Sequence, residues 1–293
     1  MNSNKKLAIS IIFLLIMGMT VLILNKGSHQ PPMENSSVKG IRIVSMGPYA
    51  TENLFLLGLG DNITALTIHD LPVRRAGKEI IGTLIDPNIE KILSMKPDIV
   101  IASKEGNMEG SLNKLSQLGI RTLALDQLHS FDDICRNFIT LGRELNSEET
   151  AENILIQSKQ RLDRIKPGPG KKSKVFFILG FKPLITTGNM TYIDEMISLA
   201  GGINIFSDTD KKWFACSVEE VVRRNPDIIF FTGMEKDTEF FGKRLPEIKA
   251  VRESMVFEMD DTVIGSPTPA TFVDSVETIY GLISGKGKNV FEK

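Results

Sequence analysis

The chain of 293 residues contains few of the residues that build covalent or metal-held scaffolds. It has two cysteines, three histidines and one tryptophan. Two cysteines exclude a disulfide framework and a four-cysteine zinc site, and Cys135 and Cys216 are either two buried thiols or one bridge. The histidines at positions His29, His69 and His129 are scattered without ligand spacing. The sequence therefore predicts no bare-metal site.

An excess of one charge and the common catalytic motifs are also missing. Lysine and arginine number 35 against 36 acidic residues, so no global basic field exists to bind nucleic acid. The chain has no G-x-S-x-G nucleophile elbow and no H-E-x-x-H pair. The glycines at 58–60 follow an expected helix, and the lysine-rich segment 170–173 precedes an expected strand, so neither fits a nucleotide loop. We expect a binding protein rather than an enzyme.

The N-terminus combines a basic segment with an apolar one. Lys5 and Lys6 precede an uncharged apolar run, residues 7–24, which as a helix would span about 27 Å, close to the hydrocarbon thickness of a bilayer. Residues 1–24 thus predict an export signal or a membrane anchor, cleaved or retained, with the rest of the chain on the outer side of the membrane. Residues 25–40, which include two prolines, are typical of a flexible linker.

From residue 41 onward, short β-branched runs alternate with amphipathic stretches, the pattern of parallel sheets flanked by helices. The fold class is predicted as α/β, with two Rossmann-like lobes of mainly parallel sheets at 41–145 and 173–293. A helix start signal, an apolar stripe at helical spacing and a Pro-Gly-Pro-Gly stop predict one stiff helix of about 30 Å over 146–166, joining the lobes. The strands expected are 41–45, 63–67, 99–102, 122–125 and 175–179, and the helices expected in the first lobe are 51–57, 88–95, 108–118 and 131–145.

Residues 88–101 are echoed by residues 217–230, at a constant offset of 129. In both copies a polar residue opens a short helix, a proline closes it and an apolar strand follows. Glu90 and Glu219 therefore occupy the same place in the first helical turn. They either complement the helix dipole or form two matched acidic posts for a roughly two-fold partner with basic residues.

Several segments, in this order, resemble the substrate-binding proteins of ABC importers whose two α/β lobes are joined by a rigid backbone helix. The resemblance covers residues 41–284 and rests on 42–52, 82–90, 96–100, 200–206, Trp213 and 217–227. Members of that family bind cobalamin, ferric siderophores or haem. The resemblance implies docking onto a permease dimer through one glutamate per lobe, here Glu90 and Glu219, with Glu220 as a neighbouring alternative.

Ligands of open α/β sheets bind at the carboxyl ends of the strands, in the crevice between lobes. We predict the ligand-binding residues Met46, Tyr49, His69, Leu84, Phe181 and Trp213. Tyr49 and Trp213 offer broad aromatic contact to a flat ligand, although an aromatic here can also be core. His69 is either an axial ligand of a bound metal chelate or a solvated loop residue. Leu84 departs from the aromatic residue found there in the cobalamin-binding members.

We expect an extracytoplasmic component of an ABC importer that captures a metal chelate and carries no permanent cofactor. The chelate is a corrinoid such as cobalamin, or a ferric siderophore or haem; an anionic siderophore would need basic residues, for which Arg74 and Arg75 are the candidates unless they form a solvated pair. The alternative is a membrane-tethered sensor or carrier that works without a permease. Such a module would have no use for matched glutamates.

Overall fold

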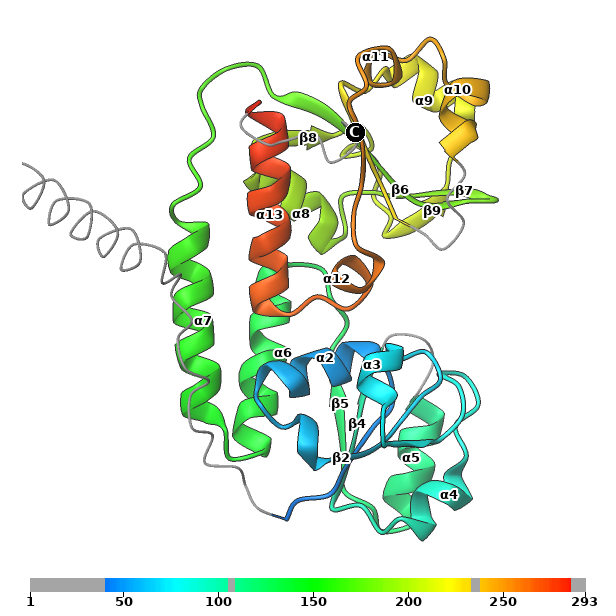
Figure 1. Cartoon of the computed structure of the whole chain (residues 1–293), viewed down its shortest axis with the longest axis vertical. Helices are drawn as coiled ribbons and strands as arrows, with labels where there is room; N and C mark the ends of the chain where they lie inside the picture. The colour runs from blue at the N-terminus through cyan, green and yellow to red at the C-terminus, as the bar shows by residue number, and fades with distance from the viewer. Residues whose placement is uncertain (1–39, 105–108, 233–237, 286–293) are drawn as a thin grey trace, which may run out of the picture. The chain divides into compact units, whose positions relative to one another are not determined.

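The computed structural model describes residues 40–104, 109–232 and 238–285 (Figure 1). Within these ranges no helix is both long and apolar enough to span a bilayer. The predicted signal or anchor at 1–24 and all but the last residue of the predicted linker at 25–40 lie outside the described residues.

The first lobe is a five-stranded, fully parallel sheet with strand order β3-β2-β1-β4-β5. Its β-branched strand residues alternate between two buried faces: Val44 and Val100 pack with α4 and α5, whereas Ile43 and Ile99 face the other side. The predicted strands and helices are confirmed to within three residues at their ends. The strands are β1 Ile43–Ser45, β2 Ile63–Leu66, β3 Glu79–Ile80, β4 Ile99–Ser103 and β5 Thr122–Leu125, and the helices are α2 Pro48–Leu56, α3 Pro72–Arg75, α4 Ile89–Ser94 and α5 Glu109–Gln117, with a short 3-10 turn at Gly60–Asn62.

The second lobe is built on a six-stranded mixed sheet that follows the path β11-β10-β6-β7-β9, with β8 paired to β6. Strand β6 runs parallel to β10 and β8, whereas β7 is antiparallel to both β6 and β9. The strands are β6 Ser173–Phe181, β7 Leu184–Thr187, β8 Gly202–Asn204, β9 Trp213–Ala215, β10 Ile228–Phe231 and β11 Val256–Glu258. The helices are α8 Tyr192–Leu199, α9 Val218–Arg224, α10 Thr238–Arg244, α11 Lys249–Arg252 and α12 Asp261–Gly265.

A layer of three helices links the lobes: α6 Phe131–Glu144, α7 Glu148–Leu162 and α13 Pro269–Ile283, which run alongside one another (Figure 1). The helix predicted over 146–166 is α7, but it has 15 residues and ends four residues before the predicted end. It is also not alone, because α13 packs against both α6 and α7, and Arg161 of α7 pairs with Asp274 and Glu277 of α13 at 2.6 Å.

One cluster of buried apolar side chains extends from the first lobe through this helical layer into the second lobe. It includes Leu54, Phe138, Ala151, Val175, Phe230 and Phe272. Because close-packed cores resist shear, the continuous core couples the two lobes mechanically.

Candidate functional site

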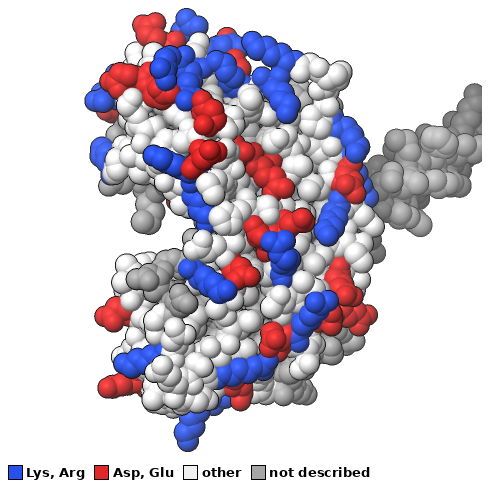
Figure 2. Space-filling view, turned by 180° about the vertical axis from the view of Figure 1, so that it is seen from behind, with Lys and Arg blue, Asp and Glu red and all other residues white. Residues whose placement is uncertain are grey.

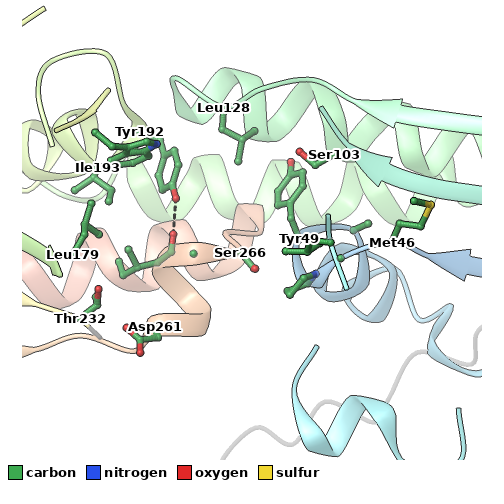
Figure 3. A pocket seen from close by; sticks show the side chains of 17 residues that line it. Met46, Tyr49, Ser103, Leu128, Leu179, Tyr192, Ile193, Thr232, Asp261 and Ser266 are labelled. Atoms are coloured by element: carbon green, nitrogen blue, oxygen red, sulfur yellow. Dashed lines mark hydrogen bonds between the residues drawn. The ribbon is translucent and has the colours of Figure 1, made fainter. Parts of the chain in front are cut away.

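A cavity of about 490 Å³ lies between residues of the two lobes. Figure 3 shows Met46 and Tyr49 on one side and Leu179, Tyr192 and Ile193 on the other. On the face drawn in Figure 2 the surface is hollowed at one edge. The lining consists of Met46, Gly47, Pro48, Tyr49, Ala50, Leu84, Ser103, Leu128, Leu179, Tyr192, Ile193, Trp213, Thr232, Asp261, Ile264, Gly265 and Ser266.

The first-lobe wall is the loop between β1 and α2. Gly47 adopts φ 141°, and a Cβ added there would lie 2.7 Å from Leu84 Cδ2, so only glycine lets the loop approach Leu84. Pro48 then starts α2, which orients Tyr49 at the first turn. The hydroxyl of Tyr49 accepts a hydrogen bond from Asn137 Nδ2 at 3.2 Å, and burial raises its pKa well above the usual tyrosine value. Tyr49 is therefore a neutral phenol with one polar end and an apolar ring.

The second-lobe wall is built around the start of α8 and the edge strand β9. Thr191 caps α8, and Tyr192 at its first position donates its hydroxyl proton to the carbonyl of Ile264 at 2.5 Å. Trp213 on β9 meets the Tyr192 ring edge to face, with ring centroids 6.1 Å apart. Its side chain is 38% exposed, which is high for the only tryptophan of the chain. An aromatic pair with one exposed member is suited to contact a flat ligand.

Charge is scarce in the cavity. Among the described lining residues, Asp261 in the first turn of α12 is the only one with an ionisable carboxyl or basic group, and it is exposed. Arg74, a candidate for an anionic ligand, instead donates to both carboxylate oxygens of Glu52 at 3.1 and 2.9 Å. The lining is thus apolar and aromatic, with a few hydroxyls and one negative charge.

Four of the six predicted ligand-binding residues line this cavity: Met46, Tyr49, Leu84 and Trp213. Their contact with a ligand stays a prediction. The other two lie elsewhere, because His69 is exposed in the loop after β2, and Phe181 packs edge to face against Phe231, Phe240 and Phe241 in the second-lobe core.

The prediction missed Leu128, Tyr192, Asp261 and Ser266, which also line the cavity. Only Tyr192 had a local signal, since an aromatic side chain after a Thr helix cap lies at a strand-to-helix junction.

The part of the chain that the structure describes contains no cluster of metal-binding side chains and no disulfide. No three His, Cys, Asp or Glu side chains gather there at metal-binding distance. Cys135 and Cys216 are both free thiols, so the structure does not have the bridge that the sequence left open; Cys135 is buried as expected and Cys216 is partly buried. Burial raises the pKa of each thiol to about 11, so neither is a reactive thiolate at neutral pH.

The two echoed segments fold into the same unit, α4 with β4 and α9 with β10. Asn88 and Ser217 cap the helices by accepting from the backbone N–H groups of Lys91 and Glu220. Before the proline, the residue in each copy turns left-handed, with φ 48° at Lys96 and 46° at position 225.

An aspartate after the proline ties each unit to its sheet. Asp98 accepts from the backbone N–H of Arg42 at 2.7 Å, and Asp227 accepts from that of Lys174 at 2.8 Å. The side chains of the same two basic residues also donate to backbone carbonyls at the helix ends, Arg42 to that of Met95 just after α4 and Lys174 to that of the last residue of α9. Glu90 and Glu219 are both exposed at the first turn of their helices, and no ion pair of the described residues includes either.

A model of the periplasmic binding protein family matches residues 43–263. The chain belongs to this family. Among its relatives, the vitamin B12-binding protein of Vibrio cholerae serotype O1 is 32% identical over 242 residues, which is 81% of this chain and 87% of the relative. The counterpart from Pectobacterium carotovorum is also 32% identical, over 66% of this chain and 71% of the relative.

Solved structures of the family share the fold. The periplasmic vitamin B12-binding protein of Vibrio cholerae has 28% identity and a TM-score of 0.66, covering 85% of this chain and 98% of its own. The periplasmic haem-binding protein of the same species has 19% identity and a TM-score of 0.74, covering 83% and 98%. At that identity the second match supports the fold alone. The predicted family and the predicted two-lobed α/β class are confirmed.

Proposed function

We propose that this protein is the extracytoplasmic substrate-binding component of an ABC importer and that its cargo is a corrinoid. The observation that carries the proposal is the lining of the cavity, which is aromatic and apolar with no lysine or arginine among its described residues. Two of the relatives at 32% identity are named for vitamin B12 binding. The comparisons thus agree with the chemistry of the cavity.

The net charge of the ligand distinguishes a corrinoid from haem and the anionic siderophores as a fit to this cavity. Haem has two carboxylates and many ferric siderophores are anionic, so burying either beside Asp261 without a cation would leave costly unpaired charge. A corrin ring is instead fringed by neutral amides. Their N–H groups match the Asp261 carboxylate, and their carbonyls match the hydroxyls of Ser103, Thr232 and Ser266 around the cavity.

The same lining favours recognition of the ring over coordination of its metal. His69 is exposed and outside the cavity, so it is poorly placed to act as an axial ligand. A tyrosine ligates iron as a phenolate, but burial raises the pKa of Tyr49. We therefore propose that Tyr49, Tyr192 and Trp213 contact the flat ring over a broad aromatic surface. The metal of the cargo then keeps its own axial ligands.

Delivery is proposed to use the exposed Glu90 and Glu219 as docking posts for arginines on two permease subunits. They occupy equivalent positions in two similarly folded units, which a two-fold partner would match. Glu220, the alternative second post, is already engaged with Arg223 and Arg224. The competing hypothesis, a sensor or carrier without a permease, gives these exposed carboxylates no role.

Ligand titration tests the cargo. The purified full chain is titrated with cyanocobalamin, cobinamide, haemin and a ferric siderophore, with fluorescence of Trp213 as the signal. We expect corrinoids to bind at least about tenfold more tightly than the anionic chelates, a difference of about 1.4 kcal/mol. Tighter binding of haemin, or binding of none of the four, would remove the proposal.

A charge swap sharpens this test. Asp261→Lys should weaken corrinoid binding and improve haemin binding, because it converts the single lining charge into a partner for carboxylates. Asp163→Lys, an equal change at an exposed position at the end of α7, is the control and should alter neither affinity.

A further inference from the structure

Residues 126–131, which comprise the β5–α6 connection and the first residue of α6, touch the second lobe at three points. The Lys212 ammonium donates to Gln127 Oε1 at 3.1 Å, His129 Nδ1 donates to the carbonyl of Met190 at 3.3 Å, and the backbone N–H of Phe131 donates to Glu195 Oε2 at 2.6 Å. All three contacts join residues at least 61 positions apart. They form a polar seam between the lobes beside the cavity.

The first-lobe end of this segment is fixed by a buried amide. Asn137 of α6 donates from Nδ2 to the carbonyl of Asp126 at 2.8 Å and accepts the Asp126 N–H on Oδ1 at 2.9 Å. The same Nδ2 donates to the Tyr49 hydroxyl. Asn137 therefore holds the start of the segment and an aromatic wall of the cavity in one hydrogen-bonded group.

The second-lobe end attaches next to the opposite wall. Lys212 precedes Trp213 in the chain, and Glu195 lies on α8 three residues after Tyr192. Leu128, in the middle of the segment, lines the cavity itself. The seam thus connects Tyr49 on one side with Tyr192 and Trp213 on the other through a short chain of contacting residues.

Glu195 makes the shortest of the three contacts. Its half-buried carboxyl oxygen accepts from the first N–H of α6, a helix of 14 residues. Burial raises the pKa of this carboxyl, as do the nearby Asp132 and Asp133 carboxylates, so the contact rests on a buried acceptor oxygen rather than on full negative charge. The Phe131 ring stacks on Phe272 of α13 with centroids 4.7 Å apart, which keeps that N–H directed at Glu195.

We propose that residues 126–131 form a clasp that sets the spacing between the Tyr49 wall and the Tyr192 and Trp213 wall, with Glu195 as the positioning residue that closes it. The clasp presents a preformed slot, so the ligand does not have to order the lobes as it binds. The effect on cargo rests on the proposed function, but the spacing is a property of the protein without ligand.

The spacing is measured first, without any ligand. Nitroxide labels are attached to Val73→Cys and Val222→Cys, both exposed and in different lobes, in a background with Cys135 and Cys216 changed to alanine. Double electron–electron resonance spectroscopy between the two labels then gives the interlobe distance distribution. We expect a single narrow distribution for the parent and a broader one for Glu195→Ala. Glu195→Gln keeps an acceptor oxygen and should restore the narrow distribution.

A neighbouring acid supplies the matched control. Asp194 is on the same helix and is also partly buried, but it bonds within its own lobe, to Asn204 Nδ2 at 3.0 Å. Asp194→Ala should lower stability without broadening the interlobe distance. If Glu195→Ala does not fold, the double variant Gln127→Ala and His129→Ala breaks the same seam through exposed side chains. A distribution unchanged in the folded clasp variant overturns the proposal.

Ligand kinetics then link the clasp to binding. We expect cobinamide to dissociate roughly tenfold faster from Glu195→Ala than from the wild type, and within about twofold of the wild-type rate from Glu195→Gln. If the wild type binds no corrinoid, the cargo assignment fails while the distance measurement still tests the clasp. Equal dissociation rates for wild type and Glu195→Ala would contradict its role in binding.

Discussion

The two lobes contain the same helix-and-strand unit with different side chains around it. In both, a capped short helix carries an exposed glutamate, and an aspartate ties the following strand to its neighbour. The residue after the glutamate differs. In the first lobe it is Lys91, which pairs with Glu79 and donates to the Ile80 carbonyl; in the second it is Glu220.

Lys91 and Glu220 have opposite charges, yet each forms an ion pair within its own lobe. Lys91 is tied to β3 and Glu220 is tied to Arg223 and Arg224, so in each lobe the second residue of the pair is engaged within the chain. Glu90 and Glu219 are both exposed, and the Glu219 side chain bonds only locally, to the Ser217 cap and its own backbone. The difference between the lobes teaches that the exposed carboxylate, rather than the local charge pattern, is what the two copies have in common.

Reversing the charge of both docking posts, Glu90 and Glu219, should have the largest effect on function. Glu90→Lys with Glu219→Lys should abolish cellular uptake of the ligand while ligand affinity stays within about twofold, because both side chains lie outside the cavity. Uptake of labelled ligand and titration of the purified protein check this. Glu149→Lys with Glu152→Lys on α7 changes the charge equally and should transport normally. Normal transport by the post variant would remove the docking proposal.

Neutralising single residues of the second lobe distinguishes the post from its neighbour. Glu219→Gln should slow uptake several-fold, since it removes an exposed charge from the proposed interface. Glu220→Gln should leave uptake nearly unchanged, because its carboxylate already pairs with two arginines. The initial uptake rate at low ligand concentration is the measurement. The reverse ranking would assign docking to Glu220.

The aspartates that tie each unit to its sheet should differ in stability cost. Asp98→Ala and Asp227→Ala each lose a hydrogen bond that a backbone N–H donates to a charged acceptor, which should cost about 1.5–3 kcal/mol. The loss should be larger at Asp227, which also pairs with Lys249 at 2.8 Å. Urea unfolding of both variants gives the comparison. Equal losses would mean that the lysine pair contributes nothing.

Low pH should remove the stability that the ionised Asp227 carboxylate contributes. Partial burial alone would raise its pKa, but the Lys249 ammonium and the Lys174 N–H lower the pKa below the usual aspartate value. A lowered folded-state pKa gives stability that is present above the unfolded pKa of about 3.9 and is lost as the pH falls through the folded value. The stability difference between wild type and Asp227→Asn should be constant near neutral pH and shrink below about pH 4. A difference that grows in acid would contradict this sign.

Removing the helix caps should have the smallest effect. Asn88→Ala and Ser217→Ala each free one backbone N–H at the helix start and should cost about 1 kcal/mol. The two losses should be similar, because both caps accept one bond from the third residue of the helix. Differential scanning calorimetry of the two variants checks the match, with Ser94→Ala at the other end of α4 as the control. Unequal losses would show that the two helices depend differently on their sheets.

The amino-acid sequence by itself determined the α/β class, the internal echo and most strands and helices of the first lobe, but not the short α3 and β3. These follow from periodicity, capping residues and Pro-terminated helices, which are properties of neighbouring residues. The equivalence of Glu90 and Glu219 could be predicted for the same reason, because a repeated local pattern folds into a repeated unit.

Only the tertiary structure decided which of the predicted side chains reach the cavity and which other side chains join them. Phe181 ends a strand, as a ligand contact would, yet the pleat turns it toward three other phenylalanines in the core. Trp213 reaches the cavity because β9 pairs antiparallel with β7, a departure from the parallel pattern that no local signal announced. Tyr192 and Asp261 join it from the starts of two helices, α8 and α12, that are far apart in the chain. Local patterns fix which helix or strand forms, whereas the pairing and packing of distant elements fix which side chains face one another across the cavity.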